Sequence, residues 1–536
     1  MRKVKSSILL GLFALLPLTA FAQFDFKVVR GKCMPDMIEN TSADSQSRSD
    51  GRRYLPDVNT HWDSLKVYRQ MVILFEYADS SFQSEDPRTS FDRLFNEPGF
   101  AFEGAGNVGC VADYFRSQSG GLFNVQFDVY GPYKVSQKAQ PYDNPTASTS
   151  NYAKNSIAEA TKLMIQANPD LDFSVYDWDG DNKINQVIFV AASYTGNTPS
   201  QAYYGFLWPH TASISTVTTP DGYKISNYSA SAELWPNSKS CGLGTICHEY
   251  SHSLGLPDIY PTSSTAGYSV CDEWDLMDGG NFTNYGWCPC NYTAMEKIVL
   301  GWLTPIDLTD SITIKDLKPV EEGGEVYRIK HSDSEWLLLE NRQQRGWDAG
   351  APGKGLVIYH VDYDPAKWKN NVVNNVPGKR CFELIHADNM DYDDWDNYLN
   401  DSNLGTYANK RHMNSRLLSG SPYPHTYLTS DSVVFVNNAL TEVSVPAPVM
   451  NRNNDEGEAQ LNKPITNIQM TDEGLISFDF MGGTPVVVDG IATLHPSPVT
   501  LHHQIFDLNG RRLASEPQKG VYIIRKQDGT IKKVFK

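Results

Sequence analysis

Residues 247–258 read CHEYSHSLGLPD, which fits the pattern H-E-x-x-H-x-x-G-x-x-D. If the first part of this stretch is helical, His248 and His252 stand one turn apart on the same face, so both imidazoles can reach one metal ion. Glu249 lies beside them, where a carboxylate can accept a proton from a water molecule and pass it to a leaving amine. The spacing therefore predicts a catalytic zinc site with Glu249 as the general base.

The residues after the helix indicate how a third ligand reaches the same ion. Gly255 can adopt the positive φ that ends a helix and turns the chain back, and Pro257 prevents the helix from resuming. This return delivers Asp258 as the third ligand. Three protein ligands leave a fourth tetrahedral position open, as in a catalytic zinc site. The alternative is an ordinary amphipathic helix with two solvated histidines.

A second segment, WDLMDGG at residues 274–280, places Met277 before a glycine-rich turn and resembles the Met-turn of metzincin proteases. Further matching segments are Asp113-Tyr114-Phe115, Asp128-Val129-Tyr130-Gly131, Trp208-Pro209-His210, Glu296, Gly301-Trp302-Leu303, Glu340-Asn341-Arg342 and residues 355–362. Together these segments, spread over about Val67 to Phe480, resemble the immune inhibitor A family of secreted bacterial metallopeptidases.

The resemblance implies an α+β fold, with a metzincin-type zinc protease domain followed by an antiparallel β-sandwich domain and a small C-terminal β module. It also implies that His248, His252 and Asp258 bind zinc, that Glu249 is the catalytic base and that Met277 forms the floor under the metal. The usual third ligand of metzincins is His. Because Asp is anionic, we expect the zinc to be a somewhat weaker Lewis acid here.

The N-terminal sequence is typical of an exported protein. Basic residues precede an apolar run over residues 8–21, and Ala20-Phe21-Ala22 forms a cleavage site, so residues 1–22 are predicted to be a secretory signal peptide. The run is short for a membrane span, and no later stretch reaches the required length, so we expect no transmembrane segment in the mature chain. The predicted location is extracellular or at the cell surface.

Composition agrees with a large extracellular enzyme. The net charge of −17 is unsuited to nucleic acid and favours solubility and cation binding. The eight cysteines permit disulfides in an exported chain, but the sequence does not select a pairing. Cys288 and Cys290 are too close for an easy mutual bridge, so they have separate partners or stay reduced as small buried side chains.

Residues 23–64 are polar and are predicted to form an arm or pro-segment. Cys33-Met34-Pro35-Asp36 within it resembles the cysteine switch of some metzincin zymogens, in which a thiolate occupies the open zinc position. The spacing is one residue shorter than usual, and reserving Cys33 leaves an odd number of cysteines. A plain disulfide or a free thiol is the alternative.

The stretch DWDGDNKIN at residues 177–185 resembles the first part of an EF-hand calcium loop. The candidate ligands are Asp177, Asp179, Asp181, the main-chain carbonyl of Lys183, and Asn185. Position 12 of the loop is Ile188, which cannot supply the bidentate carboxylate. We expect a structural calcium ion here, and the alternative is a solvated acidic turn.

Two further residues are weaker candidates for the active site. Tyr292 begins a predicted helix over residues 292–300 and could contact the metal or the developing oxyanion, although packing in the core is the commoner role. His210 is not a predicted ligand, and a hydrogen-bonded packing role is favoured.

From residue 306 the pattern changes to short alternating or apolar runs separated by turns, which predicts β structure packed on the catalytic domain. The expected organisation is a signal peptide at 1–22, an arm at 23–64, a catalytic domain at 65–305, a β-rich domain at 306–482, and a linker with a C-terminal module at 483–536. An Asp-rich loop at 388–401 could hold a second calcium ion, but a solvated loop is favoured.

The C-terminal module is basic on an acidic protein. Its segments at 505–512, 519–524 and 532–534 resemble the β-sandwich signal that type IX secretion uses to cross a gram-negative outer membrane, so the outer-membrane secretion machinery is an expected partner. The alternative is an ordinary final β module.

These observations predict a secreted zinc endopeptidase that acts on protein or peptide substrates, as a monomer. One alternative is a non-catalytic surface adhesin or glycan-binding protein with a vestigial metal site. Another is a metal-dependent hydrolase of non-protein bonds, for which no residue gives positive support. The presence of Glu249, which zinc binding does not need, favours the peptidase.

Overall fold

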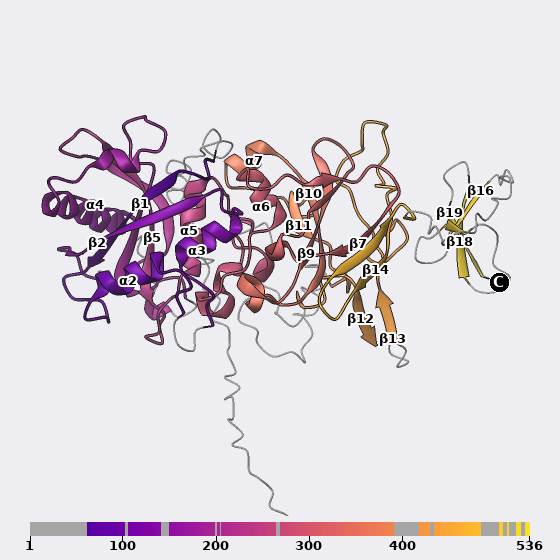
Figure 1. The fold of residues 1–536 in the computed structure, drawn as a ribbon, viewed down its shortest axis with the longest axis horizontal. Coiled ribbons are helices and arrows are strands. Elements are labelled where there is room, and N and C mark those ends of the chain that lie inside the picture. Colours follow the sequence, from indigo (N-terminus) through magenta and orange to yellow (C-terminus); the bar gives the residue numbers. More distant parts are fainter. Residues whose placement is uncertain are drawn as a thin grey trace, which may run out of the picture.

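The computed structural model describes residues 62–101, 106–140, 150–198, 201–203, 205–263, 269–390, 418–428 and 434–483, together with the backbone of four strands between 503 and 535. The predicted signal peptide, nearly all of the arm with Cys33, most of the Asp-rich loop and the linker lie outside the described residues. The chain has the expected mixed α+β character (Figure 1).

The N-terminal half is built on a five-stranded sheet with the order β2-β1-β3-β5-β4. All neighbouring strands are parallel except β4, which is an antiparallel edge strand paired with β5. The strands are β1 (Val67–Glu76), β2 (Asn124–Lys134), β3 (Val187–Tyr194), β4 (His210–Thr218) and β5 (Lys224–Leu234).

Helices cover both faces of this sheet, which explains why β1 and β3 are apolar runs rather than alternating ones. Met71, Ile73 and Phe75 face the core under helix α4, whereas Val72 and Leu74 face the core under α3 and α5. The helices are α2 (Pro87–Asn96), α3 (Val111–Gln118), α4 (Ser150–Ala167), α5 (Gly244–Leu254) and α6 (Ala294–Val299).

The second half is mainly β. One sheet has the order β11-β10-β9-β8-β6, a second has the order β14-β15-β7, and β12 and β13 form a separate hairpin. All pairs are antiparallel, as expected, except the short β6–β8 pair, which is parallel. The elements are β6 (Ile306–Asp307), β7 (Ile312–Leu317), β8 (Tyr327–Lys330), β9 (Glu335–Arg342), β10 (Gly355–Asp362), α7 (Pro365–Lys369), β11 (Phe382–Leu384), β12 (His425–Leu428), β13 (Val434–Asn437), β14 (Ile465–Met470) and β15 (Ile476–Phe480).

The two halves share one hydrophobic core. Leu337 and Leu339 on β9 pack toward the sheet that contains β14 and β15, while Leu338 between them packs into the same cluster as Val72 of β1 and Ile246 of α5. The central sheet of the second half therefore lies between the N-terminal half and the smaller sheet (Figure 1). The core is continuous across the domain boundary expected at residue 305.

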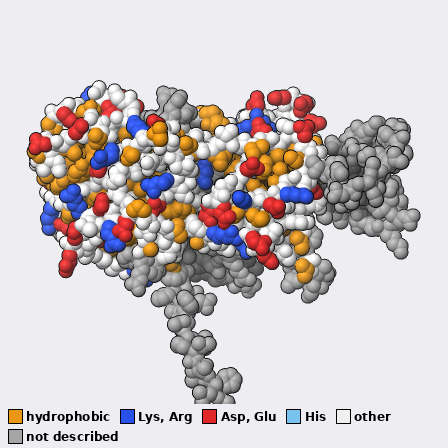
Figure 2. Space-filling view, viewed as in Figure 1, with side chains coloured by type: hydrophobic (Ala, Val, Ile, Leu, Met, Phe, Trp, Pro, Cys, Tyr) orange, Lys and Arg blue, Asp and Glu red, His pale blue; other side chains and the backbone are white. Residues whose placement is uncertain are grey.

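Two features lie at the far end of the chain. Val434 and Val436 on β13 are exposed, and hydrophobic side chains are visible where the β12–β13 hairpin projects in Figure 2. The backbone of β16 (His503–Phe506), β17 (Arg512–Leu513), β18 (Val521–Lys526) and β19 (Ile531–Phe535) forms an antiparallel sheet, and the assignment of this segment as a separate C-terminal module stays a prediction. Within the described part of the chain, no helix has the length and hydrophobicity needed to cross a membrane.

Candidate metal centre

Helix α5 places the three candidate side chains of the motif in the interior of the protein. His248, Glu249 and His252 are all buried, and the two imidazole rings lie 4.9 Å apart at an interplanar angle of 85°. Residues four apart are neighbours on a helix surface, so the spacing in the sequence accounts for this arrangement. The helix and its two histidines are as predicted.

The chain then turns back to bring in a carboxylate. The helix ends at Gly255, whose φ of 110° is in the left-handed region, and the Leu256 amide donates to the Ser251 carbonyl. This turn places Asp258 Oδ1 at 3.3 Å from His248 Nε2 and at 3.1 Å from His252 Nε2. One oxygen and two nitrogens therefore converge in a buried position.

Hydrogen bonds fix the orientation of both imidazoles. His248 Nδ1 is 2.8 Å from the Leu276 carbonyl, and His252 Nδ1 is 2.8 Å from the Leu256 carbonyl. A carbonyl can only accept, so each Nδ1 carries the proton and each Nε2 presents a lone pair toward Asp258. Such a convergence of acceptor atoms fits a bound cation.

The separations also fit a small metal ion. Zinc ligands lie about 2.0–2.2 Å from the ion, so two ligands at a tetrahedral angle are roughly 3.3 Å apart. The two separations between Asp258 Oδ1 and the Nε2 atoms of the histidines, 3.3 and 3.1 Å, agree with that value. Two imidazoles and one carboxylate form a donor set that suits zinc, and these residues leave room in the set for one further ligand.

Glu249 is held by a residue that the sequence did not reveal. The Thr211 hydroxyl lies 3.1 Å from Glu249 Oε2 and 2.7 Å from the Glu249 carbonyl oxygen. Thr211 belongs to the edge strand β4, so this contact places the sheet edge beside the predicted base. Nothing in the spacing between residues 211 and 249 could have indicated it.

The segment of the predicted Met-turn contacts the site through the carbonyls of Leu276 and Met277. Met277 is fully buried, its amide donates to Asp275 Oδ1 at 2.7 Å, and its carbonyl accepts from the Ile259 amide, one residue after Asp258. Burial and the neighbouring Glu296 raise the pKa of Asp275, and burial raises the pKa of Glu296 to about 7. Asp275 and Glu296 therefore form a pair of buried carboxylic acids, of which Asp275 belongs to the turn segment.

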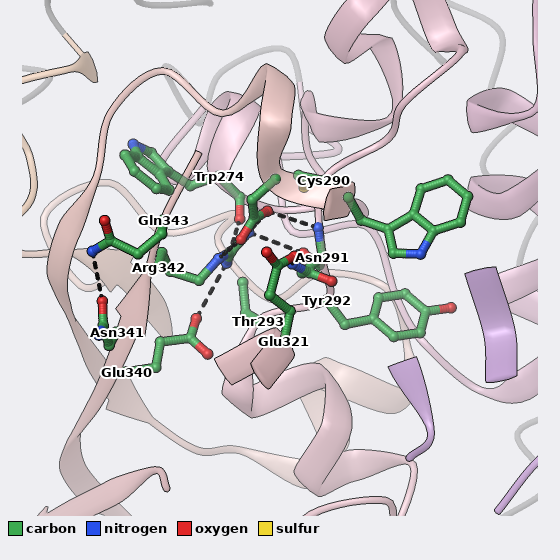
Figure 3. Close-up of polar contacts among 12 residues, drawn as sticks. Trp274, Cys290, Asn291, Tyr292, Thr293, Glu321, Glu340, Asn341, Arg342 and Gln343 are labelled. Atoms are coloured by element: carbon green, nitrogen blue, oxygen red, sulfur yellow. Dashed lines mark hydrogen bonds and ion pairs between the residues drawn. The ribbon is translucent and has the colours of Figure 1, made fainter. Parts of the chain in front are cut away.

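Arg342 on β9 connects the second half of the chain to the Met-turn region (Figure 3). Its guanidinium donates to the carbonyls of Trp274 and Asn291, each at 3.2 Å, and bonds both oxygens of Asp348 at 2.6 Å. A further contact joins it to Glu340 at 3.2 Å. Burial alone would raise the pKa of Asp348, but Arg342 lowers it below the usual range.

The two weaker candidates occupy hydrogen-bonded positions. Tyr292 is fully buried, packs edge-on against Tyr114 and at a tilt against Trp302, and bonds the Ser251 hydroxyl. His210 bonds the Trp208 carbonyl and the Tyr228 hydroxyl, each at 2.7 Å, which fits the favoured packing role. A metal or oxyanion contact of Tyr292 stays a prediction.

The predicted calcium loop brings its three aspartates together. Asp177, Asp179 and Asp181 offer oxygens within 4.8 Å of one another, and burial together with the neighbouring carboxylates raises the pKa of Asp179. Lys183 Nζ lies 2.5 Å from Asp181, and Asn185 Oδ1 accepts from the Trp178 amide. A calcium ion would have to compete with the Lys183 ammonium, and the site stays a prediction.

The described cysteines are buried thiols. They are Cys110, Cys241, Cys247, Cys271, Cys288, Cys290 and Cys381. Burial raises the pKa of the Cys288 thiol to about 12, so this thiol is inert at neutral pH. The expectation that Cys288 and Cys290 do not bridge each other agrees with this state.

The fold and the site bring two histidines and one aspartate together in a buried cluster whose donor set suits a single metal ion. Residues 66–188 and 194–299 match the family model of the immune inhibitor A peptidase M6 catalytic domain. This region is therefore similar to the catalytic domain of the immune inhibitor A peptidases, in agreement with the resemblance found in the sequence.

Two curated relatives agree with the match to this family model. The chain is 23% identical over 268 residues to immune inhibitor A of Bacillus thuringiensis subsp. alesti, over 42% of this chain and 38% of that protein. It is 24% identical over 242 residues to the pre-pro-metalloprotease PrtV of Vibrio cholerae serotype O1, over 41% of this chain and 26% of that protein. The chain thus spans well under half the length of these relatives.

Proposed function

We propose that this chain is a secreted zinc endopeptidase that hydrolyses peptide bonds in extracellular proteins. The observation that carries the proposal is the convergence of His248, His252 and Asp258 beside the buried carboxylate of Glu249. The names of both relatives, immune inhibitor A and a pre-pro-metalloprotease, support it.

In this proposal His248 Nε2, His252 Nε2 and Asp258 Oδ1 hold the ion. When bound, zinc supplies Lewis acidity, which polarises the scissile carbonyl and lowers the pKa of a water molecule. Glu249 takes the proton of the attacking water on a carboxylate oxygen and delivers it to the departing amine. Thr211 restricts the orientation of that carboxylate through its contact with Oε2.

The position of Glu249 beside the edge strand β4 supports a peptide substrate. β4 pairs with β5 on one side, and it is the terminal strand of the described sheet. An extended peptide can add to such an edge through main-chain hydrogen bonds, which suits an enzyme for unfolded or flexible segments. This observation favours a peptidase over a hydrolase of other bonds.

The finer assignments belong to the same proposal. We infer a metzincin-type catalytic domain from the helix that carries His248 and His252, the turn at Gly255 and the buried Met277. The second half is proposed to be a β-sandwich, because two of its sheets pack against a common cluster. Calcium at Asp177, zinc selectivity, export through the predicted signal peptide and delivery by the C-terminal module are likewise proposals.

The test is the digestion of an unfolded protein such as reduced casein by the purified chain. Cleavage should stop after treatment with a zinc chelator and return when zinc is added back. A chain that binds zinc but cleaves nothing would favour the adhesin with a vestigial site. Cleavage that is insensitive to the chelator would contradict the proposed zinc dependence.

A further inference from the structure

The third proposed ligand is held by a residue from the second half of the chain. Asn371 Oδ1 accepts from the Asp258 amide at 2.6 Å, and Asn371 Nδ2 donates to Asp258 Oδ2 at 2.8 Å. One side-chain amide therefore contacts both the backbone and the carboxylate of the same residue. Since the Asp258 amide can only donate, the contact also fixes which end of the Asn371 side chain faces which atom.

This arrangement selects the carboxylate oxygen that faces the histidines. With Oδ2 engaged by Asn371, Oδ1 is the oxygen that lies 3.1–3.3 Å from the two Nε2 atoms. A carboxylate without such a partner could rotate about its terminal torsion, which is broad. Both residues are largely buried, so solvent does not substitute easily for the amide.

The loop that carries Asn371 is itself rigidly anchored. Asn374 donates to the carbonyls of Ile259 and Phe382, at 2.9 and 2.8 Å, and accepts from the Cys381 amide at 2.9 Å. Asn375 Oδ1 accepts from the Thr262 amide at 2.7 Å. The loop therefore links the segment after Asp258 to strand β11.

We infer that the metal centre extends into the second half of the chain, with Asn371 as the positioning residue for the metal ligand Asp258. The inference rests on the proposed metal site. It adds a residue beyond position 299, where the match to the family model ends. It means that the β-rich half is part of the metal-binding unit, in agreement with the shared core.

The backbone of Asn371 determines which substitutions are informative. Its φ is 57°, in the left-handed region that Asn, Asp and Gly tolerate better than other residues. Asn371→Gly removes the amide without backbone strain. Asn371→Asp keeps an acceptor for the Asp258 amide, but it removes the donor to Oδ2 and places two carboxylates together.

The test measures zinc affinity of the purified full chain by competition with a chelator of known affinity, without any assay of cleavage. Loss of a residue that orients a metal ligand lowers affinity about 10–100-fold, and we expect this for both Asn371 variants. The matched control is Asn375→Ala, which loosens the same loop without a contact to Asp258 and should stay close to the wild-type affinity. Circular dichroism establishes that each variant is folded.

The outcomes distinguish a failure of the proposed role of Asn371 from a failure of the proposed function. Unchanged zinc affinity in both Asn371 variants, or equal weakening in Asn375→Ala, overturns the role of Asn371 while the proposed function stands. A wild-type chain that binds no zinc overturns both. If wild type binds zinc without cleaving casein and the Asn371 variants bind it more weakly, the positioning role is supported and the proposed function fails.

Discussion

Replacing Arg342 by Met should destabilise the junction between the two halves of the chain. The substitution keeps the apolar stem but leaves Asp348 and Glu340 buried without their common cation. Removal of one partner from a buried ion pair costs about 3–5 kcal/mol. The carbonyls of Trp274 and Asn291 also lose a donor, at about 1–3 kcal/mol for each that stays dry.

We expect a total of about 5 kcal/mol, which is less than the sum of these costs because the contacts share one side chain. Because the two halves share one core, the cooperative unit is about 420 residues, and this loss corresponds to a fall in melting temperature of roughly 6 °C. The assay is thermal unfolding followed by tryptophan fluorescence, since Trp274 lies 5.8 Å from the Arg342 guanidinium.

Two variants control this experiment. Arg345→Met removes an arginine whose partner Glu322 is also exposed, and such pairs contribute about 0–1 kcal/mol. The double variant Arg342→Met/Asp348→Leu should recover part of the loss, because no carboxylate at 348 is then left unpaired. An Arg342→Met melting temperature within about 3 °C of wild type, or equal to that of Arg345→Met, would refute the reasoning.

The pH dependence gives an independent check. In the wild type the pKa of Asp348 is lowered, so its stabilising contribution is present at neutral pH and is lost as the pH falls through the folded-state pKa. In Arg342→Met, burial should raise the pKa of Asp348. Its carboxyl group should then become protonated as the pH falls, which removes the unpaired buried charge that destabilises the variant. The difference between wild type and Arg342→Met should therefore shrink as the pH is lowered from 7 to 5.

Three further predictions concern other parts of the chain. Burial alone would lower the pKa of His360, but hydrogen bonds with Glu335 and Glu383 raise it to about 9. The stabilising effect of the His360 charge should therefore be complete below about pH 6.5 and disappear as the pH rises through about 9. His360→Asn should lower the melting temperature at pH 6 and have little effect at pH 10. Calcium at a hundredfold excess over its dissociation constant should stabilise the wild type by roughly 3 kcal/mol, and Asp177→Asn should weaken this effect. If millimolar calcium does not change the melting temperature, the loop is a solvated turn. If Cys33 provides latency, the chain beginning at Gln23 should be inactive until a mercurial modifies the thiol; full activity of that form, or no activation by Cys33→Ser, would exclude the switch.

The local geometry of the metal centre follows from sequence spacing. Two histidines four residues apart must share a helix face, and Gly255 permits the turn that returns Asp258. Strands such as β1 and β10 were equally predictable, because each contains a short apolar run of strand length that is bounded by polar residues. In each case the relevant interactions span only a few residues.

The contacts made from the second half could not be predicted in this way. Asn371 and Asp258 are 113 positions apart, and a run of asparagines after a short helix has the same pattern as a solvated turn. The approach of Thr211 to Glu249 depends on the pairing of β4 with β5, which fixes where the sheet edge lies. The contact of Asn371 could be recognised only when the packing of the two halves was known, and the contact of Thr211, within the first half, only when the strand order of its sheet was known.

The most direct test of the proposed mechanism is a comparison of Glu249→Gln and His252→Ala in zinc content and casein cleavage. Glu249→Gln leaves the three proposed ligands intact and removes the base, so it should bind one zinc ion while kcat/KM falls on the order of a hundredfold or more. His252→Ala should lose the zinc itself. A zinc-loaded Glu249→Gln chain that cleaves casein at the wild-type rate would contradict the account.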